Sequence, residues 1–111
     1  MRLEGRDAGD TRIVTVLEDR IDAAVAIRFK DLMREQNAGG PERIVLDLSR
    51  VAFIDSSGLG AVVATMKNMD GRRLELAGLT PAVDKVFRLT RIDSIFAIHA
   101  RVEDALQTRA G

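Results

Sequence analysis

Apolar residues change their spacing several times along the chain, and these changes predict strands that alternate with helices. Residues 12–17 form a short segment rich in β-branched side chains, which is typical of a strand. This segment follows the turn-like residues 7–10, and Leu3 lies in a second short segment before that turn. We therefore expect a β-hairpin near the beginning of the chain.

A helical spacing begins at Asp22. The residues that recur on one helical face from there are Val25, Phe29, Leu32, Met33 and Gln36. The charged residues of this segment lie elsewhere around the helix, and residues 39–41, Gly-Gly-Pro, end it. The pattern predicts an amphipathic helix with Asp22 as its N-cap.

The rest of the chain repeats the alternation. We expect strands at residues 44–48, 73–77 and 95–98, and helices at residues 59–69, 81–89 and 102–108. Thr80 is the expected N-cap of the helix 81–89, which has Pro81 in its first turn. The order predicts a single α/β domain over residues 1–111. Its mixed, mostly parallel central sheet would have about four to five strands, with about four helices packed on it.

Composition and charge narrow the possible functions. The 111 residues hold 17 Lys plus Arg and 17 Asp plus Glu, with no basic or acidic block, so we expect neither a nucleic acid nor a membrane as partner. The absence of cysteine excludes disulfides and thiolate chemistry. No apolar run approaches the roughly 20 residues of a membrane span, and residues 1–10 hold no apolar leader segment. We expect a cytoplasmic protein.

Residues 54–60, IDSSGLG, lie between a predicted strand and a predicted helix and carry more polar groups than a turn requires. The carboxylate of Asp55 and the hydroxyls of Ser56 and Ser57 can accept hydrogen bonds from the first N–H groups of the helix. Gly58 allows a tight entry into the helix. The segment is therefore expected, at the least, to cap a helix at the end of a strand.

Catalytic chemistry finds little support in the sequence. A nucleophile elbow has glycine two residues before its serine, where this chain has Asp55, and the only histidine, His99, lies at the last predicted strand. Gly58-Leu59-Gly60 lacks the third glycine of a dinucleotide-binding loop. A metal site could use only oxygen ligands, and the candidates are more typical of caps and turns: Asp19, Asp22, Asp47 and Asp55. We expect a module that is not an enzyme and needs no cofactor or metal.

IDSSGLG after a buried strand, with PAVDKVFRL at residues 81–89, resembles the STAS domain of bacterial anti-sigma factor antagonists. The resemblance covers nearly the whole chain, because the hairpin, the first helix, the strand IVLDL, the serine motif, the strand RLELAG and the T-P-A-V helix follow the family's order. The family usually has G-x-L-D before its first helix. Here Asp22 matches the last position and Asp19 replaces the glycine.

The resemblance implies a phosphorylation-controlled protein-interaction module. Ser57 would be phosphorylated by a partner that is both a serine kinase and an anti-sigma factor, and a PP2C-like serine phosphatase would reset it. Asp55, Ser56 and Gly58 would shape the site. The partner would be bound while Ser57 is free and released once Ser57 carries phosphate.

The partner surface is expected around Ser57, on the first turn of the following helix and on the loop before the first helix. The candidate residues are Asp22, Leu59 and Gly60. A phosphate at a helix N-terminus agrees with the helix dipole, so we expect it to leave the domain folded and to act on the interface. An alternative is a scaffold module of the same family, in which the helix N-terminus at Ser56 and Ser57 holds a small ligand or a nucleotide.

Overall fold

A five-stranded sheet forms the centre of the molecule in the computed structural model, which describes residues 1–107. Its strands, in spatial order, are β1 (Leu3–Ala8), β2 (Thr11–Val16), β4 (Arg43–Asp47), β6 (Arg73–Ala77) and β7 (Ile98–His99). β1 is antiparallel to β2, and every other neighbouring pair is parallel. The predicted mixed, mostly parallel sheet is confirmed, as is the hairpin that starts it.

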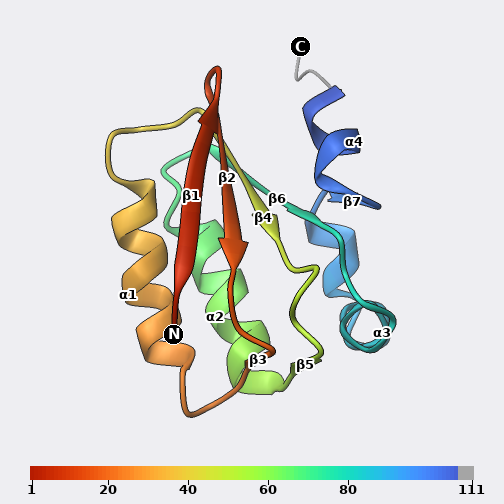
Figure 1. Ribbon diagram of the computed structural model, residues 1–111. Coiled ribbons are helices and arrows are strands. Elements are labelled where there is room, and N and C mark those ends of the chain that lie inside the picture. The colour runs from red at the N-terminus through yellow and green to blue at the C-terminus, as the bar shows by residue number, and fades with distance from the viewer. Residues whose placement is uncertain (108–111) are drawn as a thin grey trace.

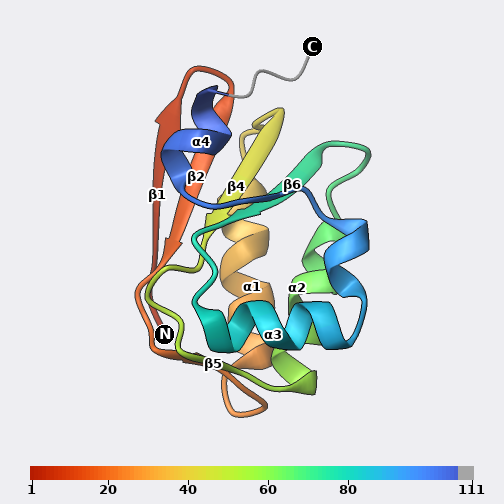
Figure 2. The ribbon, with the colours of Figure 1, turned by 90° about the vertical axis from the view of Figure 1, so that its right-hand side faces the viewer.

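Helices cover both faces of this sheet, as Figures 1 and 2 show. They are α1 (Ala26–Asn37), α2 (Ser56–Lys67), α3 (Pro81–Leu89) and α4 (Val102–Gln107). The main core joins one face of the sheet to α1 and α2, and α3 adds Val83 and Phe87 to it. On the opposite face, α4 places Val102 and Ala105 in a smaller apolar cluster with the sheet. Thr108, the last residue of the predicted helix 102–108, lies outside the described residues.

Two very short strands form a second sheet that the sequence pattern did not predict. β3 (Arg20–Ile21) pairs in parallel with β5 (Phe53–Ile54), so the chain before α1 lies beside the chain before α2. Ile21 and Ile54 are buried in the main core. Figure 1 shows both strands at the lower end of the molecule, next to the beginning of α2. A two-residue strand has no room for a periodic pattern, so only its pairing identifies it.

Several boundaries differ from the predictions. Asp22 is not the N-cap of α1, because that helix begins at Ala26 and its capping position is Val25. The carboxylate of Asp22 instead accepts a hydrogen bond from the Ala24 N–H at 3.1 Å, a turn typical of aspartate. Thr80 does occupy the N-cap position of α3, but its hydroxyl donates to the Val51 carbonyl at 2.8 Å.

The end of the chain also departs from the predicted strand at residues 95–98. Residues Ile92–Ile95 form a turn of 3-10 helix, and the strand itself is Ile98–His99. The 3-10 turn begins after Arg91, whose φ of 61° is left-handed. Phe96 is buried and Ile98 packs against the core, whereas Ile95 in the 3-10 turn is 50% exposed. A short apolar run does not by itself distinguish a helical turn from a strand.

Candidate functional site

The IDSSGLG motif occupies the junction between β5 and α2. Ile54 ends the strand, Asp55 is the N-cap with an extended backbone, and Ser56 begins the helix, three residues earlier than predicted. Asp55 Oδ1 accepts a hydrogen bond from the Gly58 N–H at 2.9 Å, which satisfies one of the free donors at the helix start. The capping pattern in the sequence therefore correctly identifies Asp55.

The second carboxylate oxygen of Asp55 reaches a different part of the chain. Oδ2 accepts a hydrogen bond from the Ala23 N–H at 3.0 Å, in the loop between β3 and α1. The hydrogen bond from Gly58 is the largest influence on this carboxyl and lowers its pKa. Burial opposes that effect, and the bond from Ala23 adds to it, so the pKa of Asp55 lies below its ordinary value. Asp55 thus holds the loop before α1 against the start of α2 in its ionised form.

Gly58 is buried where α2 approaches β3. A Cβ atom at this position would overlap with the carbonyl oxygen of Ile21. The close approach explains why a glycine stands inside the first turn of a helix, where it lowers helix propensity. The neighbouring Leu59 packs into the main core with only 5% of its surface exposed. Leu59 was expected at the partner surface, but its side chain is directed into the fold.

Ser56, Ser57 and Gly60 are exposed on the first turn and a half of α2. Within residues 1–107, neither serine hydroxyl makes a hydrogen bond. Asp22 lies in the loop that Asp55 holds in place, and its side chain remains 18% exposed beside Arg20. The structure therefore brings Asp22, from before the first helix, to the same end of the molecule as the serines.

An exposed aromatic residue also lies at this end, and the sequence patterns did not single it out. Phe53 of β5 is 48% exposed, and the guanidinium of Arg20 from β3 lies over its ring, 5.8 Å from the ring centre. Phe53 precedes Ser57 by four residues, so their Cα atoms are at most about 14 Å apart. From the sequence alone, a large apolar residue directly before a buried position would be predicted to lie in the core. Only the pairing of β3 with β5 shows that Phe53 faces outward.

His99 is engaged elsewhere. Its Nε2 atom lies 2.7 Å from Glu75 Oε1, and the same oxygen accepts a hydrogen bond from Arg43 at 2.7 Å. Burial acts to raise the pKa of Glu75, but the hydrogen bonds from Arg43 and His99 outweigh it, so the pKa is lowered. This buried group lies on the face of the sheet that α4 covers, where Arg43 also donates to the Ala105 carbonyl at 2.6 Å. Among residues 1–107, no three acidic or histidine side chains gather as a metal site would require.

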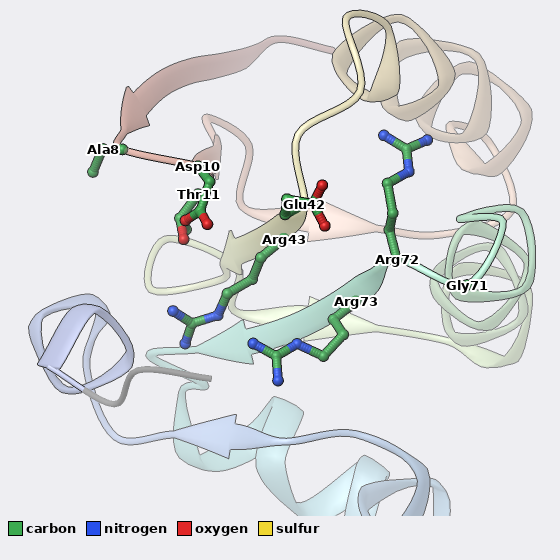
Figure 3. A pocket seen from close by; sticks show the side chains of 9 residues that line it. Ala8, Asp10, Thr11, Glu42, Arg43, Gly71, Arg72 and Arg73 are labelled. Atoms are coloured by element: carbon green, nitrogen blue, oxygen red, sulfur yellow. The ribbon is translucent and has the colours of Figure 1, made fainter. Parts of the chain in front are cut away.

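A cavity of about 700 Å³ lies at the beginning of the parallel strands β4 and β6, at the end of the molecule opposite the IDSSGLG motif, as Figure 3 shows. The turn between β1 and β2, the beginning of β4 and the turn before β6 line it. Arg43 and Arg73 point to the side that α4 covers, and Arg72 points to the opposite side. Two smaller cavities involve the α1–α2 groove and the loop after α1. No residue of IDSSGLG lines any of these three cavities.

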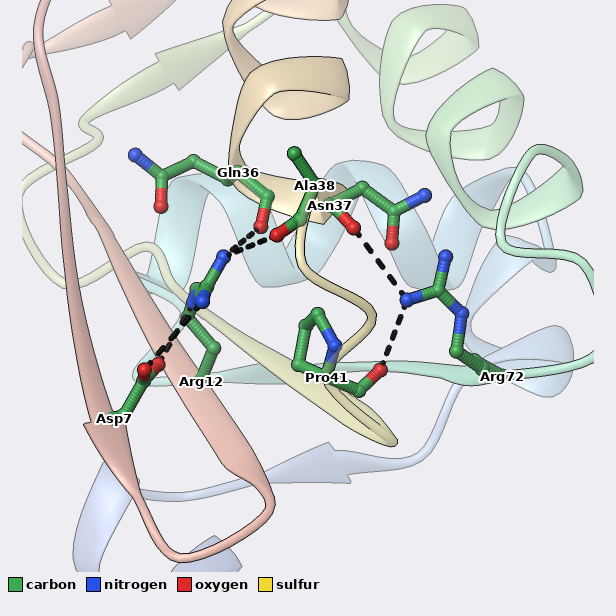
Figure 4. Close-up of polar contacts among 7 residues, drawn as sticks. All are labelled: Asp7, Arg12, Gln36, Asn37, Ala38, Pro41 and Arg72. Atoms are coloured by element: carbon green, nitrogen blue, oxygen red, sulfur yellow. Dashed lines mark hydrogen bonds and ion pairs between the residues drawn. The ribbon is translucent and has the colours of Figure 1, made fainter.

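The arginines around this end hold the loop after α1 in place, as Figure 4 shows. Arg12 donates to the carbonyls of Gln36 and Ala38 and forms an ion pair with Asp7 at 2.8 Å. Arg72 donates to the carbonyl of Pro41 at 3.1 Å. These contacts satisfy backbone acceptors at and beyond the last turn of α1. The cationic side chains of Arg12 and Arg72 are thus engaged in contacts within the fold.

Comparisons with known proteins agree with this geometry. The family model of the STAS domain matches residues 6–105. BtrV of Bordetella bronchiseptica, a candidate anti-sigma factor antagonist, is 31% identical over 83% of this chain and 81% of its own length. An anti-sigma factor antagonist from Mycobacterium paratuberculosis superimposes with a TM-score of 0.86 and 26% identity, over 96% of this chain and 91% of that protein.

The fold is also that of SpoIIAA, a Bacillus cell fate determinant and anti-sigma factor antagonist. Its unphosphorylated form gives a TM-score of 0.74 with 21% identity, over 95% of this chain and 93% of that protein. Its phosphorylated form gives a TM-score of 0.68 with 20% identity, over 96% of this chain and 97% of that protein. Within residues 1–107 of the present chain, no helix has both the length and the apolar character to span a bilayer.

Proposed function

The chain belongs to the STAS domain family, where its relatives are anti-sigma factor antagonists, and we propose that phosphorylation of Ser57 controls its binding to an anti-sigma factor. The partner is a serine kinase that binds the chain while Ser57 is free and is released once Ser57 carries phosphate. A PP2C-like phosphatase removes the phosphate. We also propose that residues 1–111 form one cytoplasmic STAS domain with no catalytic role of its own.

The observation that carries this proposal is the position of Ser57 in the first turn of α2. Its hydroxyl is exposed and makes no hydrogen bond within residues 1–107, so a kinase can reach it without unfolding the helix. A phosphate there would add about −1.5 to −2 charge at the positive end of the helix dipole. The related fold of SpoIIAA occurs in both an unphosphorylated and a phosphorylated form, so the fold tolerates phosphate in that protein.

The same phosphate would be costly in an interface. It would stand beside Asp55, a carboxylate that is ionised near neutral pH because its pKa is lowered from an ordinary value that already lies far below 7. A partner that covers this end would have to desolvate both anions, and any acidic group opposite would be repelled. Release by a hundredfold to ten-thousandfold requires about 2.7 to 5.5 kcal/mol, which a misplaced dianion in a desolvated contact can supply. No rearrangement of the sheet is needed.

The proposed partner surface combines Ser57 and Gly60 of α2 with Asp22 of the preceding loop. Phe53 extends it, because an exposed aromatic side chain beside an arginine is typical of the residues that dominate binding energy in protein interfaces. Leu59 supports this surface from inside the core.

The test is to incubate the chain with its kinase and ATP and to measure the intact mass and the modified residue. We expect one phosphate on the wild type and on Ser56→Ala, and none on Ser57→Ala. Ser56→Ala is the matched control, because both serines are exposed in the same helical turn. Modification of Ser57→Ala at Ser56, or no modification of the wild type by an active kinase, would contradict the proposal.

A further inference from the structure

The outer edge of β1 is open. Within the described residues 1–107, β1 lies at the end of the sheet and pairs only with β2, and Figure 2 shows it at the left margin with no labelled helix or strand beyond it. Its central residues, Glu4 to Asp7, are all exposed. An open edge six residues long presents free backbone donors and acceptors that can pair with another strand.

The hairpin determines which backbone groups are free. The Leu17 N–H donates to the Arg2 carbonyl, so the backbone N–H and C=O groups of Arg2 point toward the neighbouring strand of the hairpin. Backbone groups alternate along an antiparallel strand, and Glu4 and Arg6 therefore also bond to β2. The N–H and C=O groups of Leu3, Gly5 and Asp7 point away from the sheet.

We propose that this edge pairs antiparallel with β1 of a second copy of the chain, about a two-fold axis at Gly5. Gly5 then lies opposite Gly5 of the other copy, and Leu3 lies opposite Asp7, so all the outward backbone groups find partners. Glu4 lies opposite Arg6 of the other copy, and Arg6 lies opposite its Glu4. These two pairs are the closely spaced ones of the ladder, with Cα atoms about 4.5 Å apart.

Charge selects this register over its neighbours. Shifts that keep the outward groups paired move one strand by two residues, because the backbone alternates with period two. A shift in one direction places Glu4 opposite Glu4, and a shift in the other places Arg6 opposite Arg6. Like charges directly opposite are destabilising, whereas opposite charges stabilise a cross-strand pair. Of these three registers, only the one centred on Gly5 pairs opposite charges on both sides of the axis.

The charges of Glu4 and Arg6 also disfavour pairing of β1 with strands of other proteins. Charged residues on an edge strand ordinarily prevent pairing with foreign strands. The order Glu4-Gly5-Arg6 removes this barrier only for a strand with the same order read in the opposite direction, as in a second copy. Because one pair of edges buries less surface than a standard protein interface, the dimer is weak and exchanges with the monomer.

Sedimentation velocity tests the proposal on the wild type, at concentrations from about 10 µM to about 1 mM, a range chosen for a small interface. We expect a reversible monomer–dimer equilibrium. Arg6→Glu and Glu4→Arg each place like charges opposite one another and should weaken the dimer about tenfold or more. The double variant Glu4→Arg/Arg6→Glu restores both opposite-charge pairs and should recover the wild-type affinity. Both positions are exposed, so circular dichroism should show all three variants folded.

Amide hydrogen exchange gives an independent readout. With rising concentration, exchange at Leu3, Gly5 and Asp7 should slow, whereas Glu4 and Arg6 should not change because their N–H groups already bond to β2. A wild type that is monomeric throughout the concentration range would overturn the proposal. So would a dimer that Arg6→Glu leaves intact, or one that the double variant does not restore.

Discussion

The side chain of Asp55 accepts a hydrogen bond at 3.0 Å from the backbone N–H of Ala23, 32 residues earlier in the chain. The same carboxylate caps α2 through the Gly58 N–H. One acidic group therefore connects the loop before α1 with the turn that presents Ser57. A partner that recognises this end of the molecule meets two segments whose relative position depends on that carboxylate.

Asp55 should make stability depend on pH in the acid range. Because its folded pKa lies below the ordinary value of 3.8, the ionised carboxylate stabilises the folded state at any pH well above 3.8. This contribution is lost as the pH falls below 3.8 and through the folded pKa. Urea unfolding of the wild type and of Asp55→Asn should therefore differ most near neutral pH, and the difference should shrink toward pH 2. A difference that grows on acidification would show that Asp55 is not held in its ionised form.

Ser57→Asp should weaken binding of the kinase partner and leave the far-UV circular dichroism spectrum nearly unchanged. The substituted carboxylate lies at a helix N-terminus, which stabilises negative charge, so the cost appears only in the interface. Because aspartate carries less charge than phosphate, we expect a loss of about tenfold to a hundredfold in a titration by calorimetry. Ser56→Asp is the matched control and should bind better than Ser57→Asp. A globally unfolded Ser57→Asp protein would contradict this explanation.

Gly58 and Gly60 should respond in opposite ways to the same substitution. In Gly58→Ala the new methyl group meets the Ile21 carbonyl, and relief of this overlap should cost about 1–3 kcal/mol in the free energy of unfolding. In Gly60→Ala nothing lies within 4 Å of the new atom, and the gain in helix propensity should stabilise the protein by about 0.5–1 kcal/mol. Denaturant unfolding measures both. Equal effects at the two positions would show that α2 does not approach β3 closely.

The buried pair of Arg43 and Glu75 should behave as a unit. Each side chain is 8% exposed, and Glu75→Leu leaves the Arg43 charge without its carboxylate, which should cost about 3–5 kcal/mol. The double variant Arg43→Leu/Glu75→Leu removes the uncompensated charge and should recover about 2 kcal/mol or more of that loss. A double-mutant cycle by thermal or urea unfolding measures the coupling. Additive losses would show that the two groups do not compensate each other in the fold.

The sequence was sufficient to predict those features of the fold that depend on residues close together in the chain. Period-two and period-3.6 patterns reflect how side chains point from strands and helices, so the alternation of elements and the mostly parallel sheet follow from them. The cap at Asp55 could be predicted because the Gly58 N–H that caps the helix through it lies within one turn of Asp55. The N-cap at Asp22 was wrong for a related reason: the same side chain serves a turn and a cap equally well, and the local sequence does not distinguish them.

The sequence alone was thus enough to predict the order of the four helices and of the five strands of the central sheet, the place of the serine motif between a strand and a helix, and the family that the motif indicates. The tertiary structure decided what each residue of the motif faces. The pairing of β3 with β5 turns Phe53 outward, brings Gly58 against Ile21 and places Ala23 on Asp55. Packing of α2 then buries Leu59 and leaves Ser57 exposed. These contacts join residues about 30 or more positions apart, and their formation depends on how the whole core packs rather than on any local pattern.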